Sequence, residues 1–394
     1  MKILVVGQYF YPDNFRINEI AQELVKRGHQ VTVLTGLPDY ATGRVPKEYR
    51  HGRRRRETIE GVKVIRVPII ARRTGVLWRA LNYLSFLISS SLYVSFHKLD
   101  CDVVFCYQTS PVSMAQAAVK AKKRTGKKLV LYCLDIWPEC LKAWRVSESS
   151  PLFKVVHRYS RYIYGRCDTI AISSKPFREY LTRVNGVKDE KIVYLPQHTD
   201  EVVQEKGIGP GLSGINLAFG GNIGSVQDVE CIVKATSLVK DIPNLTVHIF
   251  GDGSNLEACR ALAREGELGD RLRFYGRVAR EELKKYYLDM DAFLLTLKAE
   301  GSIGLTVPAK LQEYMAWGKP ILGAIGGAAA EIIEEAGCGH CVAASDSDAL
   351  AATIRLFVSE QSGWREMGER AGEYYRSHFT KENFLSHLAE MLTY

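Results

Sequence analysis

The segment "INLAFGGNIGSVQDVECIVKATSLVK", residues 215–240, decides how the second half of this chain folds. It begins with a short apolar run typical of a buried strand, and residues 227–240 have a helical pattern. The glycine-rich turn between them allows the backbone to approach a neighbouring group closely. A strand followed by a helix is the repeating unit of parallel α/β sheets, so this segment predicts an α/β domain.

The same alternation of strand and helix patterns occurs throughout the chain. Further strand patterns are KILVVG at 2–7, QVTVLTG at 30–36, DVVFCY at 102–107, KLVLYCLDIW at 128–137, LTVHIFGDG at 245–253, RLRFYGRV at 271–278 and AFLLTL at 292–297. Helical patterns include residues 18–29, with Gly28 at the stop, and residues 280–290. Strands that alternate with helices predict parallel sheets covered on both faces.

The length of the chain indicates more than one domain. Because 394 residues exceed what one hydrophobic core usually organises, we predict two doubly wound, Rossmann-like domains, 1–200 and 210–374. A polar, glycine-rich linker is expected at 197–214, and the helical segment at about 375–394 is expected to pack back on the first domain. Two such domains facing across a cleft would hold a ligand between the carboxyl ends of their strands.

Cysteine usage favours a reducing compartment. The nine cysteines are odd in number and lie mostly in apolar runs, which suggests no disulfide framework. Cys338 and Cys341 have the spacing of a redox motif, but a helix, a stop at Gly337 and then a strand is the reverse of the order that such a motif needs. The apolar run at the amino end is too short for a secretory signal, so a cytoplasmic protein is expected.

Charge is distributed unevenly between the two halves. Residues 1–200 hold 34 Lys and Arg against 17 Asp and Glu, whereas residues 201–394 hold 19 against 27. The arginines Arg53–Arg56, Arg66, Arg72, Arg73 and Arg79 lie beside an amphipathic stripe made of Leu77, Leu81, Leu84, Ile88 and Leu92. This combination favours an anionic membrane surface; the alternative is a core helix behind a solvated basic loop. Nucleic acid is not expected, because no base-reading motif accompanies the charge.

The segment "GSIGLTVPAKLQEYMAWGKP", residues 301–320, predicts an anion site. We expect Thr306 or Val307 to cap a short helix with Pro308 in its first turn, so that nearby amides face a phosphate. Lys310 and Glu313 share one face of that helix. Lys310 supplies a cation for a diphosphate, and Glu313 can accept bonds from two ribose hydroxyls; the alternative is a solvated surface pair.

Three further loops follow strands of the second domain. They are FGGNIGS at 219–225, FGDG at 250–253 and YGRV at 275–278. Because the carboxyl ends of parallel strands share one edge of a sheet, we expect these loops to lie beside the 305–313 segment. Together they predict a nucleotide site built largely from backbone groups.

With these motifs, the sequence resembles a family 4 glycosyltransferase with the GT-B fold, over essentially the whole chain. The likeness rests on residues 7–40, LDIWPE at 134–139, GNIGSVQD at 221–228, the GDG and GRV loops, and PAKLQEYMAWGKPI at 308–321. It is closest to the branch that builds bacterial surface polysaccharides on lipid-linked carriers. The resemblance implies retaining transfer from a nucleotide sugar, with UDP expected, and with neither a metal nor another cofactor.

The resemblance also assigns residues. Asp135, Lys310 and Glu313 are expected to be catalytic. The donor is expected at Gly221, Asn222, Gly224, Ser225, Gly251, Arg277, Val278, Leu305, Thr306, Val307, Lys310 and Glu313. The acceptor side is expected at Phe15, Arg16, Asp135 and Glu139. Two positions depart from the family pattern: Leu305 replaces the first motif glutamate, and Gln227 lies near a position where many members carry a phosphate-binding lysine.

The expected partners are a nucleotide sugar and a polyprenyl-diphosphate-linked or other saccharide acceptor, at the inner face of the cytoplasmic membrane. Two other hypotheses stay open. One is a nucleotide-sugar epimerase on the same scaffold, and the other is a non-catalytic, membrane-associated subunit that binds nucleotide. Sequence alone assigns neither the sugar nor the linkage.

Overall fold

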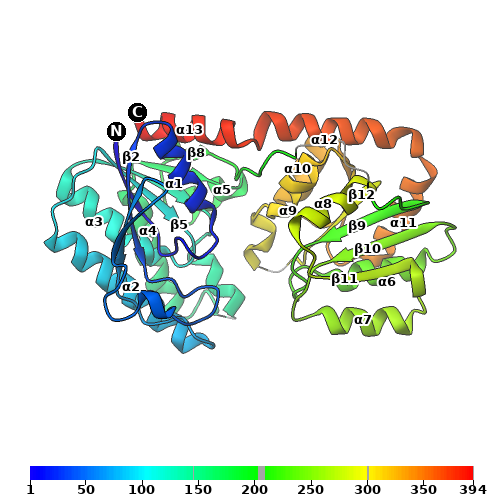
Figure 1. Cartoon of the computed structure of the whole chain (residues 1–394), viewed down its shortest axis with the longest axis horizontal. Coiled ribbons are helices and arrows are strands. Elements are labelled where there is room, and N and C mark those ends of the chain that lie inside the picture. Colours follow the sequence, from blue (N-terminus) through cyan, green and yellow to red (C-terminus); the bar gives the residue numbers. More distant parts are fainter. Residues whose placement is uncertain (145, 203–208, 300, 394) are drawn as a thin grey trace. The chain divides into compact units, whose positions relative to one another are not determined.

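The chain forms two compact units, each with one β-sheet (Figure 1). The computed structural model describes residues 1–144, 146–202, 209–299 and 301–393. Unit 1 consists of Met1–Pro196 with Leu385–Tyr394, and unit 2 consists of Gln197–Phe384. Within the predicted linker, residues 203–208 lie outside the described residues.

Unit 1 contains an eight-stranded sheet in the order β3-β4-β2-β1-β5-β6-β7-β8. Its strands are β1 (Lys2–Val6), β2 (Gln30–Gly36), β3 (Arg56–Ile59), β4 (Val62–Val67), β5 (Val103–Gln108), β6 (Lys128–Cys133), β7 (Thr169–Ile172) and β8 (Ile192–Tyr194). All neighbours are parallel except β3 and β4, which pair antiparallel. The prediction of purely parallel sheets was therefore wrong at this edge, where Glu60 and Gly61 both have positive φ and form a two-residue hairpin turn.

Hydrophobic runs explain the centre of this sheet. The side chains of β1 from Ile3 to Val6 are buried, and β1 lies between β2 and β5. The helices of unit 1 are α1 (Arg16–Lys26), α2 (Val76–Phe96), α3 (Gln116–Thr125), α4 (Pro151–Arg166) and α5 (Pro176–Arg183). The connection from β1 through α1 to β2 runs toward one edge of the sheet, and the connection from β4 through α2 to β5 runs toward the other edge. Because crossovers between parallel strands are right-handed as a rule, the two helices cover opposite faces, and the carboxyl ends of β1 and β5 border the switch point.

Unit 2 contains a six-stranded, fully parallel sheet in the order β11-β10-β9-β12-β13-β14. Its strands are β9 (Ile215–Gly220), β10 (Leu245–Phe250), β11 (Leu272–Gly276), β12 (Ala292–Thr296), β13 (Ile321–Ala324) and β14 (Gly339–Val342). Its helices are α6 (Val229–Leu238), α7 (Leu256–Glu265), α8 (Arg280–Leu288), α9 (Ala309–Ala316), α10 (Ala328–Ala336), α11 (Ser347–Ser359) and α12 (Trp364–His378). Here the winding direction changes between β9 and β12, so the segments after these two strands meet at the switch point.

Side-chain alternation along β9 divides the core of unit 2 into two layers. Leu217 and Phe219 pack into a cluster with α6 and α11 residues such as Ile232 and Ile354. Ala218, which points to the other face, belongs to a second cluster that contains Tyr314 of α9. Helices therefore cover both faces of this sheet, as the near-continuous apolar strands predicted.

The predicted helical segment at the end of the sequence is two helices, α12 and α13 (Lys381–Thr393). Leu385, Leu388 and Leu392 of α13 are buried. The Lys128 ammonium donates to the Met391 carbonyl at 2.9 Å, and Thr393 Oγ1 lies 4.0 Å from Met1 Sδ. The last turns of α13 thus pack on unit 1, beside its first strand (Figure 1).

The cysteine pair lies in the predicted order of elements. Helix α10 ends, Gly337 adopts a left-handed conformation, and β14 follows. Burial raises the pKa of the Cys338 and Cys341 thiols to about 12. Because the thiolate is the reactive form, neither cysteine is poised for redox exchange.

Candidate active site

The switch point of unit 2 brings together the glycine-rich turn after β9 and helix α9. Gly221 has a φ of +136°, and a Cβ at this position would lie 2.3 Å from Lys310 Cε. Tyr314 of α9 fixes the contact, since the Gly220 amide donates to its hydroxyl at 2.9 Å. Only glycine combines this backbone conformation with this approach, so the turn and the lysine fit as one unit.

Lys310 places a cation at this point. Its ammonium lies 3.7 Å from the centroid of the Phe219 ring. Burial lowers the pKa of Lys310 to about 7, and the Glu313 carboxylate opposes that shift. The site therefore holds a lysine with little solvent around it, whose charged form an anion would favour, beside backbone that can approach an anion closely.

The three strand-end loops also meet, as their placement at one edge of the sheet predicted. The Gly221 amide donates to the Phe250 carbonyl at 2.8 Å, and the Gly251 amide donates to the Gly276 carbonyl at 2.7 Å. A Cβ on Gly251 would lie 1.8 Å from the Gly221 carbonyl oxygen. Glycine is required here so that neighbouring loops can pack backbone to backbone.

These loops enclose a cavity of about 290 Å³. It is lined by Gly221, Asn222, Phe250, Gly251, Asp252, Arg277, Val278 and Leu283. Five of these residues were predicted for the donor, and the structure brings them together. Sequence reasoning missed Phe250, Asp252 and Leu283; the first two lie within the FGDG loop that it singled out, whereas Leu283 belongs to α8 and carries no signal of its own.

Glu313 lines a second cavity, of about 170 Å³, which shares Leu283 with the first. Arg280 and Asp200 line it too, and the Arg280 guanidinium donates to Asp200 at 2.7 Å. The Glu313 carboxylate contributes to raising the pKa of Arg280, after the larger effect of its hydrogen bond to Asp200. Glu313 thus lines the second cavity, and Lys310, one turn before it on α9, contacts Gly221 of the first.

The segment before α9 differs from the prediction in two respects. Pro308 is the N-cap residue, and the helix begins at Ala309, so neither Thr306 nor Val307 is the cap. Leu305 ends a short 3-10 turn, and the Thr306 amide donates to the Ile303 carbonyl at 3.1 Å. The extended backbone of Pro308 costs nothing at a cap, because proline lacks the amide hydrogen that the first turn leaves unpaired.

Gln227 has a definite role in the glycine-rich turn. Its side-chain oxygen accepts from Asn222 Nδ2 at 3.0 Å and from the Gly224 amide at 3.2 Å. The Gly224 amide, predicted to face the diphosphate, is therefore engaged within the turn. Ser225, the next residue of this turn that was predicted to bind the donor, is exposed.

In unit 1, Asp135 follows β6 and is held by defined partners. The Ser110 hydroxyl donates to Asp135 Oδ2 at 2.7 Å, and Trp137 Nε1 donates to Ser110 Oγ at 3.2 Å. Burial raises the pKa of Asp135, although the bonds from Ser110 oppose the shift. The carboxylate has a fixed orientation near the carboxyl ends of the central strands.

The other predicted acceptor-side residues lie in different surroundings. Phe15 stacks on Tyr9 with ring centroids 5.1 Å apart, and Arg16 opens α1. Glu139 is buried, and its carboxylate pairs with Lys142 at 2.6 Å and accepts from the Tyr180 hydroxyl at 2.9 Å. These bonds give Glu139 a structural role in the loop after β6.

The predicted amphipathic helix is α2, and its apolar stripe faces outward. Leu77, Leu84, Ile88 and Leu92 are 69%, 50%, 49% and 50% exposed, and Leu81 is half-buried. On the other face, Asn82, Phe86, Ser90 and Val94 are buried. Asn82 can be buried because it donates to Asp39 at 2.8 Å and to the Ile70 carbonyl at 2.7 Å. The alternative that this stripe packs into the core is therefore wrong.

Arg66 also differs from the prediction of a surface basic residue. It is buried, pairs with Glu57, and donates to the Tyr11 carbonyl at 2.8 Å. Within the described residues, none of the helices is both long enough and apolar enough to cross a membrane.

Two family models match this chain, one in each unit. Residues 14–198 match "Glycosyl transferase 4-like domain", and residues 214–378 match "Glycosyl transferases group 1". "Probable glycosyltransferase WbjE" of Pseudomonas aeruginosa is 28% identical over 261 residues, which cover 62% of this chain and 64% of that protein. Lipopolysaccharide 1,6-galactosyltransferase of Escherichia coli (strain K12) is 25% identical over 66% of each chain. Both matches span slightly less than two thirds of the relative's own length.

Solved structures match over nearly the full length. Sucrose-phosphate synthase from Thermosynechococcus elongatus has a TM-score of 0.74 at 17% identity, with 99% of this chain and 98% of that chain covered. The Anabaena protein HepE in complex with UDP has a TM-score of 0.72 at 15% identity, with 100% of both chains covered. At these identities the likeness concerns the fold. The chain therefore belongs to the glycosyltransferases, with a family 4-like domain in unit 1 and a group 1 domain in unit 2, and it has the GT-B fold.

Proposed function

We propose that this protein is a retaining glycosyltransferase that moves a sugar from a UDP-sugar to a lipid-linked saccharide acceptor in surface-polysaccharide synthesis. The observation that carries the proposal is the fit of Lys310 against Gly221, with Glu313 one turn further along α9. A buried cation beside a backbone turn suits a diphosphate, and a carboxylate at this spacing suits ribose hydroxyls. The UDP complex of HepE supports the choice of nucleotide.

The chemistry follows from the leaving group. Cleavage of the bond between the anomeric carbon and the diphosphate oxygen puts negative charge on the diphosphate. Lys310 stabilises that charge more in the transition state than in the ground state. The acceptor oxygen attacks from the face that the diphosphate leaves, and its proton passes to a diphosphate oxygen. In this scheme Asp135, oriented by Ser110, positions a sugar or acceptor hydroxyl, and no metal is needed.

Membrane association is part of the same proposal. The outward apolar row of α2, together with the excess of Lys and Arg in residues 1–200, supports docking at the anionic inner face of the cytoplasmic membrane. A lipid-linked acceptor would then be reached without leaving the bilayer surface.

The test is incubation of the full chain with a panel of nucleotide sugars and a polyprenyl-diphosphate sugar. Released UDP and an elongated lipid are the expected products. Epimerised donor without an acceptor would instead support an epimerase, and nucleotide binding without turnover would support a non-catalytic subunit. Adding EDTA is expected to leave the rate unchanged.

A further inference from the structure

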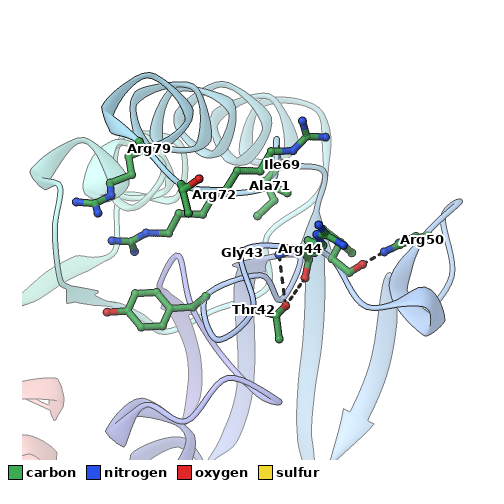
Figure 2. Close-up of a pocket in the computed structure, with 13 residues that line it drawn as sticks. Thr42, Gly43, Arg44, Arg50, Ile69, Ala71, Arg72 and Arg79 are labelled. Carbon is green, nitrogen blue, oxygen red and sulfur yellow. Dashed lines mark hydrogen bonds between the residues drawn. The ribbon is translucent and has the colours of Figure 1, made fainter. Parts of the chain in front are cut away.

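Unit 1 contains a cavity of about 1030 Å³ at the start of α2 (Figure 2). Five arginines line it: Arg44, Arg50, Arg72, Arg73 and Arg79. Among the described residues that line the cavity, none is acidic. Nor does any of the five guanidinium groups pair with a carboxylate elsewhere in the described part of the chain. The cavity therefore concentrates positive charge that no protein group neutralises.

Hydrogen bonds and a cation–π contact hold the residues of the cavity walls in place. The Arg72 amide donates to Asp39 Oδ2 at 2.6 Å, and its guanidinium donates to the Tyr9 hydroxyl at 2.8 Å and lies 4.6 Å from the centroid of the Tyr40 ring. On the opposite wall, Arg50 Nε donates to the Val45 carbonyl at 2.7 Å. Figure 2 shows the guanidinium groups of Arg72 and Arg79 on the same side of the cavity. Fixed guanidinium groups bind phosphate oxygens well, because their planar forks need little ordering.

The two carboxylates in the adjoining layer, Asp13 and Asp39, do not cancel the charge of five arginines. Asp13 accepts from the Tyr40 and Ala41 amides, each at 3.1 Å. Asp39 lies beneath Arg72 and accepts from Asn82 as well. Burial raises the pKa of Asp39 to about 6, so its carboxylate is still mostly ionised at neutral pH, but it is already bound by the Arg72 amide and by Asn82. The lining of the cavity therefore presents net positive charge to a ligand.

An apolar surface begins where the cavity ends. Arg73, Thr74 and Gly75 line the cavity, and the exposed Val76 and Leu77 follow directly at the start of α2. Because a row of exposed apolar residues continues along α2, one ligand can place an anionic group among the arginines and a hydrocarbon chain along the helix. We infer that this cavity binds the diphosphate of a lipid-linked acceptor. The inference rests on the proposed function and names the part of unit 1 that recognises that acceptor.

The experiment compares the parent protein with the double variant Arg44→Gln/Arg79→Gln. Neither guanidinium of this pair donates a hydrogen bond within the described residues, so the fold is expected to survive. The matched control is Arg158→Gln/Arg161→Gln, which removes the same charge from exposed positions of α4 outside the cavity. Binding of inorganic pyrophosphate is measured by calorimetry with saturating UDP, so that the donor site is already filled. Flotation then uses phosphatidylcholine vesicles that carry either polyprenyl diphosphate or an equal charge of phosphatidylglycerol.

The cavity variant is expected to lose about tenfold or more in affinity for pyrophosphate and for diphosphate vesicles, while the control changes by about twofold or less. Equal losses in both variants, or a loss that is as large for phosphatidylglycerol as for polyprenyl diphosphate, would overturn the inference in favour of general attraction to anionic lipid. Equal pyrophosphate affinity in parent and cavity variant would also overturn it. If no nucleotide sugar supports transfer, the proposed function fails, but pyrophosphate binding still reports on the cavity.

Discussion

Lys310 is the residue on which the proposed donor chemistry depends. Its ammonium lies 3.7 Å from the Phe219 ring, in the space that Gly221 leaves by lacking a side chain. Burial disfavours the charged form, so near neutral pH the empty site holds a mixture of charged and neutral lysine. A diphosphate would favour the charged form, so donor binding and protonation of Lys310 are linked.

The first prediction is that UDP binding takes up a proton at pH 8. The free-site pKa of Lys310 is about 7, so the lysine is mostly neutral at pH 8 and becomes charged when the diphosphate binds. Calorimetry in two buffers with different ionisation enthalpies measures this uptake. The variant Lys310→Met, which cannot titrate, is expected to show less uptake by nearly one proton. Identical uptake in the two proteins would contradict the link.

Glu313 carries the second prediction. The change Glu313→Gln is expected to weaken UDP binding by about 1–3 kcal/mol, because charge-assisted bonds to the ribose become neutral ones. Glu281→Gln is the matched control, since Glu281 lines the same cavity on α8 and is expected to leave affinity unchanged. If both variants bind UDP as the parent does, Glu313 does not contact the ribose.

At the scale of single elements, α2 is unusual because its buried face is the more polar one. Asn82 and Ser90 point inward, where their side chains find partners at Asp39 and at the Phe86 carbonyl. Burial of such groups is tolerated because each is hydrogen-bonded. The larger aliphatic side chains are left on the outer face, which is the arrangement of a helix that docks on an apolar surface.

The third prediction concerns that outer face. Leu84→Ser/Ile88→Ser is expected to change the free energy of unfolding by about 1 kcal/mol or less, because both side chains are about half exposed, but to reduce binding to anionic vesicles strongly. Leu238→Ser/Leu356→Ser in unit 2 is the control, since those leucines have similar exposure. Thermal unfolding and vesicle flotation give the two readouts. Unfolding of unit 1 by the α2 variant would show that the row is structural.

The longer elements could be predicted from the sequence because their patterns are strong. The prediction placed β2 at 30–36 and the stripe of α2 at 77–92, in agreement with the structure. Strands of four residues or fewer, such as β7 and β13, carry too few positions to show a period, and the arginine run hid the β3 strand. Likewise, the loops of the donor cavity were predictable from their glycines, but Leu283 was not, because only tertiary packing brings α8 to that cavity. Arg44 and Arg50 were missed for the same reason.

At the scale of the whole molecule, α13 joins residues that are far apart in the sequence. Its buried side chains Leu385, Leu388 and Leu392 belong to unit 1, although unit 2 separates them from the rest of that unit. Each buried leucine contributes about 1.5–3 kcal/mol by removing apolar area from water. The stability of the first unit thus depends on residues beyond position 384.

The fourth prediction is that deletion of residues 385–394 destabilises unit 1 and spares unit 2. Hydrogen exchange is expected to speed up in β1 and β6, while UDP affinity stays near the parent value because unit 2 keeps its own core. Leu388→Ala is expected to reproduce part of the effect, and Glu390→Ala, at an exposed position of the same helix, is expected to have none. Uniform acceleration across both units would contradict this division.

The position of α13 also fixes an order of events during translation. The strands of unit 1 leave the ribosome first, but the helix that covers them follows only after Gln197–Phe384 has been made. At typical elongation rates of about 5–20 residues per second, that delay is roughly 10–40 s. Throughout this interval the nascent first domain exposes the apolar surface on which Leu388 will later pack, and the second domain can reach its native state before the first does. We therefore expect cellular folding of this protein to depend on a chaperone that shields this surface until α13 has left the ribosome.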